Sequence, residues 1–378
     1  REWEMSSIGE QFELYSGNTP SRMNKNQFDG SINWITSGEL KEHYISDTKE
    51  KISEEAAKNN SLKLLPVGTF VIAIYGLEAN GVRGTCSITT RESTISQACM
   101  AFTSKMDIQN EFLYSWYKKH GNIIGIKYAQ GTKQQNLSYD IIERFNISYP
   151  CMEEQKKLIR FISLIDQRIA TQNKIIEDLK KLKSAIIEIE YSPKDSYHSH
   201  IGGAIVQISK RNKDNHLCNV LSVSNRQGFI KQSEQFEDRN VASDDTSNYK
   251  IVEKNDFAYN PARINVGSIA RLTKFETGIV SPMYICFRTK DCLLPEYLEL
   301  FFESRNFFYH IQKRLEGSVR LCLSYEELCN IPIVIPSIEK QKQVDLHLSK
   351  LAQKIDLEMK ILQFVQQQKT YLLHQMFI

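Results

Sequence analysis

The sequence predicts a mixed α/β protein built as a pseudo-twofold tandem repeat, with two globular domains and two long helices. Three observations predict this fold. Leu137 recurs as Leu323, an offset of 186 residues, and the residues after both align at that offset without a gap. Each copy then has a heptad pattern of apolar residues. The segments ahead of these patterns mix β-rich runs, aromatic helical runs and Gly-containing loops, which is typical of α/β domains.

The clearest part of the repeat aligns residues 137–150 with 323–336, both of which begin with Leu-Ser-Tyr and end with Pro. At the same offset Glu153-Glu-Gln-Lys aligns with Glu339-Lys-Gln-Lys. The similarity upstream is looser and needs small gaps. We therefore expect a variable globular part and a better-matched segment in each copy. The predicted divisions are a first globular domain (1–150), a central helix (151–192), a second globular domain (193–336) and a C-terminal helix (337–378).

Each long helix is predicted from a seam of residues spaced four and three apart. Neither 151–192 nor 337–378 contains a Gly or a Pro. Each can form a helix of about 36 residues, roughly 55 Å long. Both seams have a polar residue at the fifth place and a lysine at the eighth. The apolar seam positions are Leu158, Ile162, Ile165, Ile169, Ile176, Leu179 and Ile186 in the first copy and Val344, Leu348, Leu351, Ile355, Leu362, Val365 and Leu372 in the second.

Matching seams within one chain favour a helix pair. The pair must be antiparallel, because the first helix leads away from the first domain and the second helix has to return. The alternative is that each helix packs separately on its own globular domain.

The globular parts are predicted from local patterns. Residues 67–74 and 331–335 are rich in β-forming residues, and 112–119 and 295–311 have helical patterns with aromatic faces. Gly and Pro mark loops at 17–20, 76–84 and 131–132.

Composition narrows the function classes. The chain is 41% hydrophobic and 25% charged, which fits a folded soluble protein and excludes a disordered one. No window approaches the 18 apolar residues of a membrane span. The start at Arg1 has no secretory pattern and no initiator Met, so we expect a trimmed N-terminus in a cytoplasmic protein. A net charge of +3 permits a nucleic-acid partner without demanding one.

Catalytic and metal-binding motifs are missing from the sequence. It has no phosphate-binding loop, no G-x-G-x-x-G and no H-E-x-x-H. Its eight cysteines form no C-x-x-C pair. Asn260-Pro-Ala-Arg263 lacks the second Pro and the aromatic residue of an amino-methyltransferase motif. His198 and His200 form an H-x-H pair that could bind a metal. A solvated linker is the alternative, and we expect the linker. We therefore predict a binding protein with no catalytic residues, no metal and no cofactor of its own.

Polar loops at matching places in the two copies are the candidate binding residues. A Gly-Thr or Gly-Ser turn presents backbone N–H groups and a hydroxyl that suit a phosphate oxygen. Lys or Arg can contact phosphate or guanine, and Gln can pair with adenine. An ordinary solvated loop is the alternative. The candidates here are Lys127, Gln130, Thr132, Lys133, Gln134 and Gln135 in the first copy and Arg314, Ser318 and Arg320 in the second.

Other loops contribute weaker candidates, for which plain surface is an equal alternative. In the first copy these are Thr19, Arg22, Lys25, Tyr75, Asn80 and Arg83. In the second copy they are Arg211, Lys213, Asn225, Arg226, Tyr259, Asn260 and Arg263.

The whole chain resembles the specificity subunit of a type I restriction-modification system. The resemblance rests on the order of several motifs. They are Ile8-Gly-Glu with Gly17-Asn-Thr-Pro, then Trp34-Ile-Thr-Ser-Gly-Glu, then the Gly-Thr/Ser loop with Leu-Ser-Tyr, and the Glu-x-Gln-Lys helix start. The last two are repeated at 317–342. The second copy departs from the Gly-x-Thr-Pro pattern, with Ile201-Gly-Gly-Ala in its place.

The resemblance implies two target recognition domains, each reading one half of a split double-stranded DNA sequence. It implies that the helices form an antiparallel coiled-coil spacer that docks two methyltransferase subunits, with restriction subunits joining the complex. S-adenosylmethionine and ATP would act on those partners in a prokaryotic cytoplasm. Two other hypotheses remain open: a coiled-coil scaffold that does not touch DNA, and a fused methyltransferase or nuclease.

Overall fold

The computed structural model describes residues 3–105, 107–192, 199–225, 227–235, 245–316 and 321–377. The chain forms two compact units. Unit 1 consists of residues 1–172 together with 361–378, and unit 2 of residues 173–360. Each unit therefore contains one part of both long helices. The predicted divisions at residues 150, 192 and 336 stay a prediction, since the compact units divide inside the helices.

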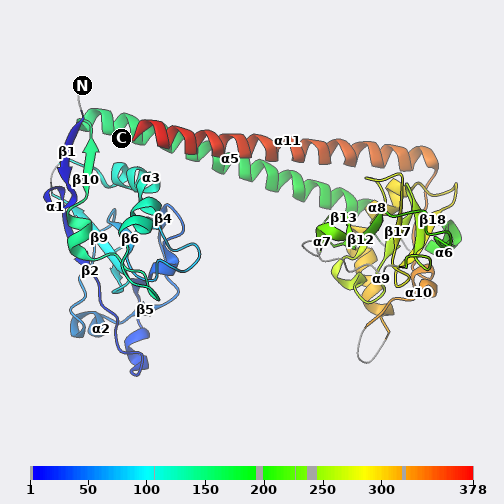
Figure 1. The fold of residues 1–378 in the computed structure, drawn as a ribbon, viewed down its shortest axis with the longest axis horizontal. Coiled ribbons are helices and arrows are strands. Elements are labelled where there is room, and N and C mark those ends of the chain that lie inside the picture. Colours follow the sequence, from blue (N-terminus) through cyan, green and yellow to red (C-terminus); the bar gives the residue numbers. More distant parts are fainter. Residues whose placement is uncertain are drawn as a thin grey trace. The chain divides into compact units, whose positions relative to one another are not determined.

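The globular part of unit 1 is a mixed α/β structure (Figure 1). Its elements in chain order are β1 (Glu4–Ser7), α1 (Ile8–Gln11), β2 (Phe12–Ser16), η1 (Lys25–Phe28), β3 (Ile32–Ile35), η2 (Ser37–Glu39), β4 (Tyr44–Ile45), β5 (Lys51–Ile52), α2 (Glu54–Asn59), β6 (Phe70–Ala73), β7 (Cys86–Thr89), β8 (Ser93–Ile95), β9 (Cys99–Ser104), α3 (Asn110–Tyr128), α4 (Tyr139–Glu143) and β10 (Asn146–Tyr149).

The main sheet of unit 1 has the strand order β2-β9-β6-β7-β4, and a smaller sheet has the order β5-β3-β8. Every residue of β6 and β7 is buried, as expected for strands that are covered on both faces. Helix α3 packs against β6, β7 and β9. The predicted strand at 67–74 and the predicted helix at 112–119 are thereby confirmed, in the form of β6 and α3.

The globular part of unit 2 is also mixed α/β. Its elements in chain order are α6 (Ile201–Ala204), β11 (Ile205–Ile208), β12 (Val220–Ser224), β13 (Gly228–Lys231), α7 (Gln232–Gln235), β14 (Lys250–Glu253), β15 (Phe257–Tyr259), η3 (Ile264–Val266), β16 (Ile269–Arg271), β17 (Thr277–Val280), β18 (Ile285–Thr289), α8 (Pro295–Phe302), α9 (Arg305–Arg314) and α10 (Tyr325–Cys329).

The sheets repeat the topology of unit 1. The order β11-β18-β15-β16 matches β2-β9-β6-β7, and the parallel pair β12–β17 matches the parallel pair β3–β8. The tandem repeat is therefore confirmed at the level of strand order. The single helix α3 is replaced in unit 2 by α8 and α9. The break comes at Ser304, whose hydroxyl accepts the N–H of Phe307 and caps a new helix.

The predicted strand at 331–335 was wrong. This segment makes one isolated bridge, between His200 and Pro332, and two backbone hydrogen bonds to Ser199 and Ile201. Pro332 has no N–H and cannot extend a ladder. Its counterpart in unit 1, β10, has no proline within its bounds and pairs over four residues with β1.

The two long helices are α5 (Met152–Glu190) and α11 (Ile338–Met376). Each apolar seam residue named above is buried or half-buried. In unit 1, Lys369 near the end of α11 pairs with Asp166 in the first half of α5. In unit 2, Lys340 at the start of α11 lies 3.5 Å from Glu190 at the end of α5. The start of each helix therefore lies beside the end of the other, and the antiparallel pair is confirmed.

Candidate nucleic-acid interface

The loop between α3 and α4 is the sharpest of the sequence-predicted sites, and it has a defined frame. Gln130 and Asn136 close it through two backbone hydrogen bonds of 2.8 and 2.9 Å. Gly131 has φ +110°, and a Cβ there would lie 2.0 Å from the carbonyl oxygen of Gln134. Glycine is therefore required at this turn. The closed loop leaves Thr132, Lys133 and Gln134 exposed.

Unit 2 has the same frame at the same offset. Glu316 and Cys322 close its loop through backbone hydrogen bonds of 3.0 and 2.8 Å. The next residue is also held equivalently: Leu137 N–H donates to Ile74 in unit 1, and Leu323 N–H donates to Pro261 in unit 2. Two of the predicted residues in this loop, Ser318 and Arg320, lie outside the described residues.

A second loop of unit 1, at 74–84, supports the first. The N–H of Leu77 donates to the Gln135 carbonyl at 3.0 Å, and the N–H of Gln135 donates to Glu78 Oε2 at 2.7 Å. The latter bond lowers the pKa of the Glu78 carboxyl, because it stabilises the ionised form. The structure therefore brings together two segments that the sequence analysis had singled out separately.

Arg83 comes from this second loop and contacts the first. Its guanidinium donates to Gln135 Oε1 at 2.6 Å, and its side chain lies against Gly125 of α3. Arg83 Nε is buried without a hydrogen-bond partner. Because Gln135 and Arg83 bind each other, they support the loop more directly than they offer groups to a ligand. Tyr75 and Asn80 belong to the same loop, half-buried and exposed respectively. Lys127 lies in the last turn of α3, with its ammonium 5.1 Å from the centre of the Tyr128 ring.

The remaining candidates of unit 1 belong to the segment after β2. The Arg22 guanidinium makes two hydrogen bonds to Glu50, of 2.8 and 2.9 Å, and lies 5.3 Å from the Phe28 ring. Its charge is therefore partly neutralised by Glu50. Thr19 is half-buried, and its N–H donates to Asn18 Oδ1. Lys25 begins η1, but its side chain lies outside the described residues.

In unit 2 the exposed candidates lie on three loops. Arg211 and Lys213 are exposed on the loop after β11, where Arg211 donates to Asn248 Oδ1 at 3.1 Å. Asn225 lies in the β12–β13 turn, next to Gly267, and Arg263 is exposed just before η3. Arg226 lies outside the described residues.

Three predicted contacts in unit 2 make hydrogen bonds inside the fold, and two of them, Tyr259 and Asn260, are buried. Tyr259 is 0% exposed and its hydroxyl donates to the Leu323 carbonyl at 3.2 Å. Asn260 is buried, and its Oδ1 accepts the N–H of Ala262, so it shapes a turn. Arg314 donates to the carbonyl oxygens of His310 and Asn330, which ties α9 to the end of α10. All three have structural roles, because their polar groups bind inside the fold.

An exposed apolar face on the helix pair was missed by the sequence analysis. Except for Ile189, its members share one feature: each stands immediately before a seam position. In unit 1, Ile159 and Leu373 pack against the domain core, whereas the side chains of the apolar face stay exposed. Phe364 is 70% exposed and Ile189 is 73% exposed. The helix face consists of Phe161, Leu164, Phe364 and Tyr371 in unit 1 and Ile175, Leu182, Ile189 and Leu357 in unit 2.

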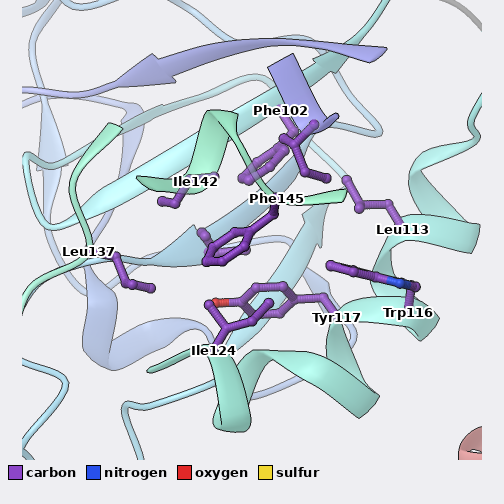
Figure 2. Close-up of a pocket in the computed structure, with 10 residues that line it drawn as sticks. Phe102, Leu113, Trp116, Tyr117, Ile124, Leu137, Ile142 and Phe145 are labelled. Carbon is purple, nitrogen blue, oxygen red and sulfur yellow. The ribbon is translucent and has the colours of Figure 1, made fainter. Parts of the chain in front are cut away.

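Clusters of metal-ligating side chains and enclosed cavities are the other places where a ligand could bind. In the described part of the chain, no group of three His, Cys, Asp or Glu side chains could hold a metal ion. An apolar cavity of about 10 Å³ lies in unit 1 between α3, α4 and the sheet (Figure 2). This volume is at the lower limit for one water molecule, so the cavity is packing space in the core. No helix among the described residues is long and apolar enough to span a membrane.

The fold and the paired loops define a class of protein: a duplicated α/β chain that presents one polar loop frame in each copy. Comparison with known proteins finds a family model similar to the first part of the chain. Residues 1–181 match the family model described as "Type I restriction modification DNA specificity domain". The first 181 residues of the chain are therefore similar to this family of DNA specificity domains.

Two curated relatives are similar over about half of the chain. The MjaIX specificity subunit of Methanocaldococcus jannaschii is 28% identical over 200 residues, which cover 51% of this chain and 45% of the relative. The EcoR124I/EcoR124II specificity subunit of Escherichia coli is 27% identical over 184 residues, 48% of this chain and 44% of the relative. The aligned part thus spans less than half the length of either relative.

Solved structures match over the whole chain at low sequence identity, so they support the fold alone. The S subunit of the type I restriction-modification system from M. genitalium has a TM-score of 0.54 at 14% identity, covering 100% of this chain and 96% of that one. A chain from a study of assembly and conformational transition of the type I R-M system has a TM-score of 0.62 at 12% identity, covering 99% and 97%.

Proposed function

We propose that this chain is the DNA specificity subunit of a type I restriction-modification complex. It binds a bipartite double-stranded DNA target, one half-site per globular domain. One observation carries the proposal: the two units hold the same loop frame, Gln130–Asn136 and Glu316–Cys322, with different side chains inside it. A constant frame with variable polar residues is what two readers of different half-sites require.

The chemistry of the complex is proposed to lie on other subunits. This chain contributes recognition and no catalytic residue. Methyl transfer from S-adenosylmethionine would take place on methyltransferase subunits, and ATP-dependent cleavage on restriction subunits. The proposal places the complex in a prokaryotic cytoplasm.

The helix face is the proposed docking surface for two methyltransferase subunits. Its apolar side chains alternate with charged ones along α5 and α11 and are not covered by the domain cores. Apolar groups clustered on a helix surface favour burial against a protein partner. Both units carry part of this face, which agrees with one methyltransferase subunit per unit.

Selection of bound DNA tests the proposed function. The chain with its methyltransferase subunit is mixed with a pool of random duplexes, and the bound fraction is sequenced. We expect two defined half-sites at a fixed gap, with binding that weakens steeply as salt rises. A pool that stays random, or binding that does not respond to salt, would favour the scaffold hypothesis.

A further inference from the structure

Gln155 lies at the junction between the first globular domain and α5. It is 0% exposed. Its Nε2 donates to two carbonyl oxygens, of Asp107 at 2.7 Å and Pro150 at 3.0 Å, and its Oε1 accepts the N–H of Gln109 at 3.0 Å. One side-chain amide thus links the loop before α3, the end of the domain and the first turn of the long helix.

Gln341 makes the same three bonds in unit 2. It is also 0% exposed. Its Nε2 donates to Cys292 and Pro336, both at 2.9 Å, and its Oε1 accepts the N–H of Leu294 at 2.8 Å. Gln341 is the repeat counterpart of Gln155, in the Glu-x-Gln-Lys match. The amide orientation is set in both cases, because one end faces two acceptors and the other faces a donor.

A second contact in each unit comes from the end of the other long helix. In unit 1 the Phe377 ring lies 5.1 Å from the Phe112 ring of α3. In unit 2 the Tyr191 ring lies 4.9 Å from the Tyr297 ring of α8. Each globular part is therefore attached both by the amide and by the end of the other helix. There Lys119 donates to the His374 carbonyl at 3.0 Å in unit 1, and the Tyr191 hydroxyl donates to the Tyr297 carbonyl at 2.6 Å in unit 2. The hydrogen bonds at the end of the other helix differ between the two units, whereas the amide makes the same three directional bonds in both. The amide is thus the directional contact that the two copies share.

We propose that Gln155 and Gln341 are positioning residues that fix the angle at which each recognition domain is held on its helix, and so restrict the gap allowed between half-sites. This inference rests on the proposed function. A gap longer by one base pair moves a half-site by about 3.4 Å along the duplex and turns it by roughly 35°. A domain held by three directional bonds resists that turn, and a domain without them follows it more easily.

The test compares methylation of duplexes that carry both half-sites at the native gap and at gaps one base pair shorter or longer. It uses the full chain in complex with its methyltransferase subunit. The readout is the rate at an altered gap divided by the rate at the native gap. For Gln155→Met and Gln341→Met we expect this ratio to rise about tenfold over wild type, the change that 1.4 kcal/mol makes in a constant. A merely stabilising role would lower all rates together.

Matched controls are Gln167→Met and Gln353→Met, which are exposed on the same two helices and are also repeat counterparts. Both should keep the wild-type ratio. If the Met variants fail to fold, the same ratio of methylation rates is measured for the shorter Gln155→Asn and Gln341→Asn variants. An unchanged ratio in folded variants overturns the inference. If wild type methylates none of the duplexes, the proposed function itself has failed.

Discussion

At the residue scale, Lys133 and Gln134 extend from a loop whose backbone is fixed by hydrogen bonds on both sides. We expect Gln134→Ala to relax selection at one position of the first half-site, because a bidentate contact with a base is worth about 1–3 kcal/mol. Lys133→Ala should weaken binding more evenly if it contacts phosphate. The measurement is sequencing of selected duplexes.

Gln363→Ala, an exposed position on α11, is the control for these loop variants and should leave selection unchanged. The second half-site should keep its selectivity in every loop variant, because this loop belongs to unit 1. Equal loss of discrimination at both half-sites would contradict the assignment of one half-site to one domain.

Glu78 gives a pH dependence at the same loop. Its pKa is lowered in the folded state by the Gln135 N–H. A carboxyl with a lowered folded pKa stabilises the fold above its unfolded pKa, and that contribution is lost as pH falls through the folded value. We therefore expect faster amide exchange at Gln135 on acidification, after correction for the intrinsic rate. Glu78→Gln should show the faster exchange already at neutral pH and little further change with acid.

At the element scale, the helix face can be separated from the seam by substitution. We expect Leu182→Glu or Phe364→Glu to abolish co-purification with the methyltransferase subunit while the thermal unfolding of the chain changes little, because surface substitutions usually cost within about 0.5 kcal/mol. Val365→Glu, one residue further along and buried in the seam, should instead destabilise the chain, because it buries a charge. Retained co-purification of both surface variants would exclude this face as the docking site.

The two long helices were predictable from the sequence because their apolar residues are periodic. The seam positions of α5 and α11 follow a heptad pattern, and a pattern that long is rarely accidental. The helix face escaped attention because only some of the residues before the seam positions are apolar. Charged residues such as Lys157, Arg168 and Asp178 interrupt the pattern in the sequence. Gln155 was visible only as a match in the repeat. Its burial depends on carbonyl groups of Asp107 and Pro150, which no sequence pattern identifies.

The candidate site was less predictable than the fold. Tyr259 and Arg314 have the residue types of DNA contacts, yet the structure uses them inside unit 2. Residue type alone does not separate a polar group that supports a loop from one that the loop exposes. Arg83 and Gln135 illustrate the same point, because two predicted contacts turn out to bind each other.

At the scale of the whole molecule, the helices should determine the gap between half-sites. Inserting seven residues into each long helix preserves the seam and adds about 10 Å of helix. We expect the preferred gap to grow by about three base pairs, at about 3.4 Å per base pair. Insertion of seven residues into an exposed loop is the control. An unchanged gap in the helix variant would show that the helices do not set the spacing.

The most direct test of the central claim is methylome sequencing of cells that express this chain with its methyltransferase subunit, compared with cells that express that subunit alone. The account predicts a split motif with one defined half-site for each globular domain, modified only when this chain is present. The same modification pattern with and without this chain would contradict it.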